Sequence, residues 1–145
     1  MKKLLLSICL WAVSAGLSAA PLEISLQALK IVQNAEGVEE LVSADVAEPG
    51  DVIEYRATYT NTADGVLRSV NPEVPVPAGL TAIAGSDQPK ASEASLNGQD
   101  FSALPLVDAD GQPVPVSKVR AFRWSVDQIQ PSESVTVSIR AMVNR

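Results

Sequence analysis

Strict alternation of apolar and polar residues in two segments is the feature that most constrains the fold. In residues 52–61 every second position is apolar, with Ile53, Tyr55, Ala57 and Tyr59. The same period runs through residues 135–143, with Val135, Val137, Ile139, Ala141 and Val143. Successive side chains of a β-strand point to opposite faces, so this period predicts strands that bury one face.

Residues 22–32 form a third apolar segment, whose alternation changes phase midway. Even positions come first, with Leu22, Ile24, Leu26 and Ala28, and odd positions follow, with Leu29 and Ile31. This change predicts a β-bulge, or a first strand that crosses between two sheets. A helix over residues 27–42 is the competing interpretation, but Asn34 and Gly37 interrupt its apolar stripe.

Turn-forming residues separate the apolar segments at short intervals. They occupy residues 34–37, 49–51, 63–65, 77–79, 97–98 and 108–111. Asn97 and Gly98 are the residues that a tight hairpin needs, because both tolerate positive φ. Three prolines in residues 72–77 predict an edge strand or an extended connector, since proline cannot donate to a sheet. Many short strands with regular turns predict an all-β antiparallel sandwich.

The first twenty residues have the layout of a secretory signal peptide. Lys2 and Lys3 form a basic segment, residues 4–13 are apolar apart from one serine, and small residues follow. The apolar segment is too short for a stable membrane anchor. We therefore expect export to the periplasm or the medium, with cleavage after Ala19 or Ala20.

Cleavage would also change the chemistry that the chain can perform. Cys9 is the single cysteine of the sequence and lies within the predicted leader, where bulky Ile8 before it argues against a lipoprotein motif. Without Cys9 the chain has no thiol for a disulfide, a nucleophile or a metal, and histidine is absent throughout. We expect no cofactor and no metal site.

The charge of the chain excludes two classes of partner. Without Lys2 and Lys3, nine basic and 17 acidic residues remain, a net charge of −8. An acidic surface repels nucleic acid and anionic lipid, so we expect neither nucleic-acid binding nor membrane insertion after cleavage. The predicted organisation is a signal peptide over residues 1–20 and one β-sandwich domain over residues 21–145, long enough for a core without disulfides.

Five short motifs follow one another along most of this domain. They are Glu48-Pro49-Gly50-Asp51-Val52-Ile53-Glu54-Tyr55, Tyr59-Thr60-Asn61-Thr62, Val76-Pro77-Ala78-Gly79-Leu80, Phe122-Arg123-Trp124 and Ile129-Gln130-Pro131-Ser132-Glu133-Ser134. In this order they resemble the bacterial conserved repeat domain known as domain of unknown function eleven. Ser132 departs from that family, which usually has glycine there, and residues 89–115 are longer than in its basic repeat.

The resemblance implies an immunoglobulin-like antiparallel sandwich carried by an exported protein. It implies no catalytic residues, because the family has no known ones. The family often occurs as tandem copies, whereas this chain contains one.

Three groups of residues resemble known kinds of site. Trp124 alternates in phase with Phe122 and is predicted to lie in the core rather than in a sugar-stacking platform. Residues 108–111 begin like a calcium loop, but Ser117 stands where the bidentate glutamate should be, so they predict a turn. Lys30 and Asn144 are the residue types of an isopeptide bond, but Asn144 lies too near the terminus.

No residue is predicted to be catalytic or to bind a cofactor or metal. A serine nucleophile would need a lysine for activation, and neither Lys90 nor Lys118 follows a Ser-x-x pattern. We expect a non-catalytic structural or protein-interaction module of the cell envelope, whose partner is another exported protein. The alternative is a soluble periplasmic ligand-binding protein with its site in residues 89–115. The strand in residues 22–32 is the best candidate for a contact surface, since a strand so placed can lie at a sheet edge and pair with a partner. The alternative is that it only closes the sandwich.

Overall fold

The computed structural model describes residues 21–145, and the predicted signal peptide lies outside the described residues. This part of the chain contains eleven strands and one short 3₁₀-helix, η1. Their bounds are β1 Leu22–Gln33, β2 Glu39–Ser43, β3 Val52–Asn61, β4 Leu67–Val70, β5 Glu73–Pro75, β6 Leu80–Ala82, β7 Glu93–Ser95, β8 Phe101–Ala103, η1 Val116–Lys118, β9 Ala121–Arg123, β10 Val126–Ile129 and β11 Ser134–Val143. No helix among the described residues is long and apolar enough to cross a membrane.

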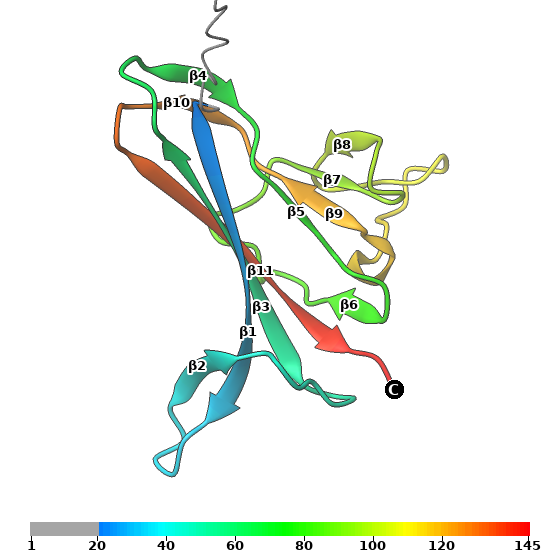
Figure 1. Cartoon of the computed structure of the whole chain (residues 1–145). Coiled ribbons are helices and arrows are strands. Elements are labelled where there is room, and N and C mark those ends of the chain that lie inside the picture. The colour runs from blue at the N-terminus through cyan, green and yellow to red at the C-terminus, as the bar shows by residue number, and fades with distance from the viewer. Residues whose placement is uncertain (1–20) are drawn as a thin grey trace, which may run out of the picture.

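The strands form an antiparallel β-sandwich, which confirms the predicted fold class. The larger sheet has the order β2-β1-β3-β11-β6 (Figure 1). A four-stranded sheet with the order β5-β9-β7-β8 and the pair β10-β4 make up the rest. All strand pairings in these sheets are antiparallel.

The core lies between the larger sheet and the two smaller ones. The larger sheet contributes the faces predicted from the alternation, including Ala57 and Tyr59 of β3 and Val137 and Ile139 of β11. The opposite layer contributes Val74, Ala94, Phe122, Trp124 and Ile129. These nine residues belong to one cluster of fourteen buried apolar residues in the described part of the chain, as the sandwich interpretation requires.

Strand β1 corrects the expectation of a bulge or a crossing between sheets. Its pairing with β3 is continuous from Leu22 opposite Asn61 to Lys30 opposite Ile53. What changes along β1 is its second neighbour, because β2 pairs with it only from Leu29 onward. The apolar side chains therefore move from the inner face to the outer face of one unbroken strand. The competing helix is wrong, since its residues form β1, a turn and β2.

Two turn predictions have different outcomes. The Asn34 side chain accepts hydrogen bonds from the backbone N–H groups of Glu36 and Val38, which forms the predicted β1–β2 turn. Asn97 and Gly98 do lie in a hairpin, but its loop covers residues 96–100 and is not a tight turn. The Asn97 carboxamide oxygen accepts from the N–H groups of Gln99 and Asp100, and this side-chain contact stabilises the longer loop.

The proline-rich segment behaves as predicted. It contains β5, which occupies an edge of the four-stranded sheet and pairs only with β9 among the described strands. Pro75 closes this short strand, and the N–H that it lacks is not needed at an edge.

Candidate functional site

The first half of β1 presents an exposed pairing surface in the larger sheet. Residues 22–28 of β1 pair with β3 on one side, and no other described strand pairs with them on the opposite side. Pairing with β2 begins at Leu29, opposite Ser43. We call residues 22–28 the free edge. Of the two alternatives left open for this segment, an edge strand or a strand that only closes the sandwich, its first half has an open edge.

The backbone groups of the free edge point into solvent at alternate residues. The N–H of Thr62 donates to the carbonyl of Pro21 at 3.0 Å, directly opposite it. Opposed pairs in an antiparallel ladder alternate between hydrogen-bonded and non-hydrogen-bonded. The odd residues of β1 therefore bond to β3, and the even ones present N–H and C=O outward, namely Leu22, Ile24, Leu26 and Ala28.

The same even residues carry apolar side chains on the inner face. Ile24 lies opposite Tyr59, and Leu26 lies opposite Ala57, both of which are buried. Ile24 and Leu26 themselves remain 57% and 55% exposed. The second layer of the sandwich thus covers β3 but leaves β1 open.

A groove runs along this open margin between β1 and the opposite layer. Its volume is about 480 Å³. Its apolar walls come from Leu22, Ile24 and Tyr59 on one side and from Leu67 and Val70 on the other. An extended segment that paired with the free edge would place alternate side chains above this groove.

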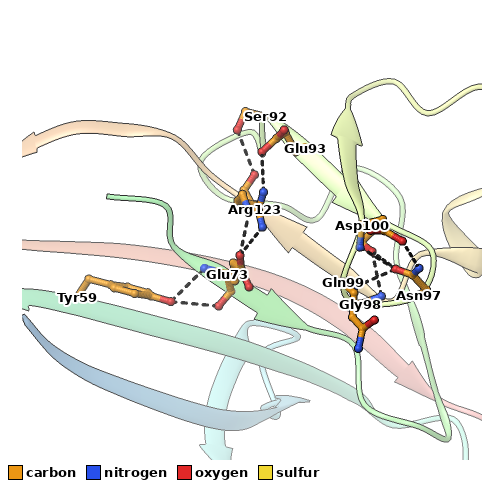
Figure 2. A network of polar contacts seen from close by, with 10 residues as sticks. Tyr59, Glu73, Ser92, Glu93, Asn97, Gly98, Gln99, Asp100 and Arg123 are labelled. Carbon is orange, nitrogen blue, oxygen red and sulfur yellow. Dashed lines mark hydrogen bonds and ion pairs between the residues drawn. The ribbon is translucent and has the colours of Figure 1, made fainter. Parts of the chain in front are cut away.

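Polar contacts join Tyr59, which lines the groove, to the opposite layer of the sandwich (Figure 2). The Tyr59 hydroxyl accepts from the N–H of Glu73 at 3.0 Å and donates to its carbonyl at 3.3 Å. The Glu73 carboxylate accepts from Arg123 Nε at 2.8 Å, and Arg123 also reaches Glu93 at 3.4 Å. The Arg123 guanidinium lies 3.6 Å from the centre of the Phe101 ring. These contacts join β3, β5, β9 and β7.

A second hollow of about 480 Å³ lies beside the β7–β8 hairpin, in the region named as the alternative ligand site. Leu96, Ala103, Leu106 and Val114 supply much of its lining, together with Asn97 and Asp100. The Asn97 amide donates to the Asp100 carboxylate at 2.7 Å, as Figure 2 shows. These two polar side chains line the hollow but bond to each other, and this contact holds the loop.

The residues predicted to have structural roles occupy the expected places. Trp124 is 2% exposed, and its indole N–H donates to the carbonyl of Pro89 at 2.6 Å. It shares the core cluster with Tyr59, Phe122 and Ile139, and Tyr55 packs against that cluster. The Asp108 carboxylate accepts from the N–H groups of Asp110 and Gln112, which makes residues 108–111 a turn.

No metal-ligating cluster of three or more acidic residues occurs in the described part of the chain. Lys30 and Asn144 do not meet. The Lys30 ammonium lies 2.7 Å from the Asp51 carboxylate, and the Asn144 carboxamide oxygen accepts from the Thr81 hydroxyl at 2.7 Å.

Several polar residues are buried that the sequence did not predict, among them Asn61 and Glu54. Asn61 is fully buried, and its amide donates to the carbonyls of Gly65 and Ile129 at 2.9 and 2.8 Å. Glu54 was placed on the polar face, yet it is only 7% exposed because Arg56 and Arg140 contact its carboxylate. The Asn-Thr motif marked Asn61, but period-two alternation carries no signal for either role.

Comparison with known proteins adds no relative: no family model, no curated protein and no solved structure matches the chain.

Proposed function

We propose that this protein is a non-catalytic module of the cell envelope that binds another exported protein by strand pairing along the free edge of β1. An added strand would bond to the outward N–H and C=O groups of the even residues. Its inward side chains would cover Ile24 and Leu26 and reach the groove beneath them.

The single observation that supports the proposal is the lack of protection at this edge. Folded proteins usually block a free edge with lysine, proline, a bulge or a covering loop. Residues 22–28 contain neither lysine nor proline, and their pairing with β3 has no bulge. An apolar edge that is left open in this way is typical of a surface that receives a partner strand.

The alternative of a ligand-binding protein receives less support. A ligand pocket usually combines an apolar lining with a few convergent polar groups. The hollow beside the β7–β8 hairpin has the lining, but Asn97 and Asp100 bond to each other within their own loop. The filled core and the open edge both favour the interaction module.

Two further points belong to the proposal. The resemblance to the conserved repeat family of exported proteins agrees with an envelope location. The absence of histidine from the chain, and of cysteine beyond the predicted leader, removes the commonest nucleophile and general base, which agrees with a non-catalytic role.

A site-specific cross-linking experiment tests the proposal. A photoreactive amino acid at Gln27 stands on the outer face of the free edge, and the same probe at Thr136 of β11 stands on the same face away from the edge. We expect a discrete cross-linked product from envelope extracts with the probe at Gln27 and none with the probe at Thr136. Equal products from both positions, or none from either, would contradict binding at the free edge.

A further inference from the structure

We propose that the strand received by the free edge is the same strand of a second copy, so that two larger sheets join into one across a two-fold axis. This inference rests on the proposed use of the free edge and names its occupant. In the proposed register the two Ser25 residues face each other on the axis. Ile24 of each copy then lies opposite Leu26 of the other, and Leu22 lies opposite Ala28.

The backbone of the free edge is complementary to itself in this register. Strand pairing requires that residues with outward N–H and C=O groups face residues of the same kind. The register places even residues opposite even residues throughout, so each outward group meets a partner. The length of the free edge also fits this register, because β2 begins to pair with β1 at Leu29, one residue beyond the last proposed pair.

The side chains are complementary as well. On the inner face, Ile24 and Leu26, now 57% and 55% exposed, would form apolar cross-strand pairs. On the outer face, Glu23 would lie opposite Gln27, and Ser25 opposite Ser25. Glu23 is the only charged residue in residues 22–28, so no like charges face each other.

Charge also selects the antiparallel arrangement, although the chain as a whole is acidic. The β1–β2 hairpin carries three acidic residues, Glu36, Glu39 and Glu40, beyond the far end of the free edge. Antiparallel pairing about Ser25 places the two hairpin ends of β1 about 50 Å apart, because a strand rises about 3.4 Å per residue. This distance is several Debye lengths. A parallel pairing would bring the two hairpins side by side.

A disulfide on the two-fold axis tests both the occupant and the register. In a chain that carries Cys9→Ser, Ser25→Cys places two thiols in a non-hydrogen-bonded pair, where Cα atoms lie about 4.5 Å apart and a disulfide can form. The matched control is Gln27→Cys, on the same face and also exposed, whose two thiols would be offset by about 13 Å. We expect mild oxidation to convert most of the Ser25→Cys protein, and little of the Gln27→Cys protein, to a covalent dimer.

Sedimentation of the chain without the cysteine substitutions gives a second readout. We expect the full chain to form a dimer at micromolar concentration, and Leu26→Lys to remain monomeric. Met142→Lys, which alters an exposed apolar residue on β11, should leave the dimer intact. Circular dichroism of each variant confirms folding.

The outcomes separate this inference from the proposed function. A monomeric chain whose Ser25→Cys variant does not cross-link, together with a different exported protein captured at Gln27, would overturn the second copy but keep the free edge as a binding surface. No dimer and no captured protein would overturn both. Equal cross-linking of Ser25→Cys and Gln27→Cys would overturn the register.

Discussion

The ammonium of Lys30 lies 2.7 Å from a carboxylate oxygen of Asp51. The same oxygen of Asp51 accepts a hydrogen bond from the N–H of Glu48 at 2.7 Å. Lys30 belongs to β1 near the point where pairing with β2 begins, and Asp51 ends the turn that leads into β3. The ion pair therefore holds the end of the free edge against the strand beside it.

This contact predicts a pH dependence of stability. The hydrogen bond from Lys30, followed by that from the Glu48 backbone, holds the pKa of Asp51 below its ordinary value of 3.8. A carboxyl group with a lowered folded-state pKa stabilises the protein above its unfolded pKa, and this contribution is lost as the pH falls through the folded value. We expect Lys30→Met to lower the free energy of unfolding at neutral pH and to have little effect at about pH 2. Urea denaturation at both pH values measures this, and an equal loss at both would contradict it.

Trp124 is predicted to be a main contributor to core stability. Replacement by alanine should lower the free energy of unfolding by about 3–5 kcal/mol, because a large buried side chain is lost. Trp124→Phe should cost less, since an aromatic ring still packs in the core and the losses are part of the buried volume and the hydrogen bond to the Pro89 carbonyl. In a chain with Trp11→Phe, native fluorescence should be blue-shifted. Emission like that of tryptophan in water would contradict burial.

Asn61 is predicted to be more sensitive to substitution than its position at a strand end suggests. Asn61→Ala leaves the Gly65 and Ile129 carbonyls without their donor and should cost at least about 2 kcal/mol. Asn61→Asp should cost more at neutral pH, because it places a carboxylate against two carbonyl oxygens, and should recover partly in acid. Asn71→Asp is the exposed control. Thermal unfolding that ranks all three variants equally would contradict this role.

Calcium is predicted to have no effect on stability. The Asp108 carboxylate already accepts two backbone hydrogen bonds in its own turn, and Ser117 replaces the glutamate that a calcium loop needs. Calorimetry should give the same Tm with excess calcium and with a chelator. A Tm that falls markedly in chelator would show that a metal is bound.

Export is predicted to leave a chain that begins at Ala20 or Pro21. The basic segment, the short apolar run and the small residues before Pro21 are the motivation. N-terminal sequencing of protein from the periplasm or the medium checks this. A chain that still begins with Met1 would contradict both the cleavage and the proposed location.

The sequence by itself determined the class of fold and much of the core. Alternation in residues 52–61 and 135–143 identified β3 and β11, because a period of two puts one set of side chains on one face whatever the neighbouring strands are. Trp124 followed from the same phase. The prolines of residues 72–77 predicted an edge strand or an extended connector, since the missing N–H is a local property of the residue, and β5 is such an edge strand.

Only the tertiary structure decided how the strands are arranged and which edge is open. β3 pairs with β11, so Thr58 lies beside Thr136, 78 residues away, and no local pattern encodes such a pairing. The phase change in β1 predicted a bulge or a crossing between two sheets, but it reflects a change of neighbours, because β2 pairs with β1 only after Ala28. The burial of Asn61 and Glu54 likewise depends on groups from distant strands. A free edge is a property of the assembled sheet, and this is why β1 could be identified as a strand from sequence while its open side could not.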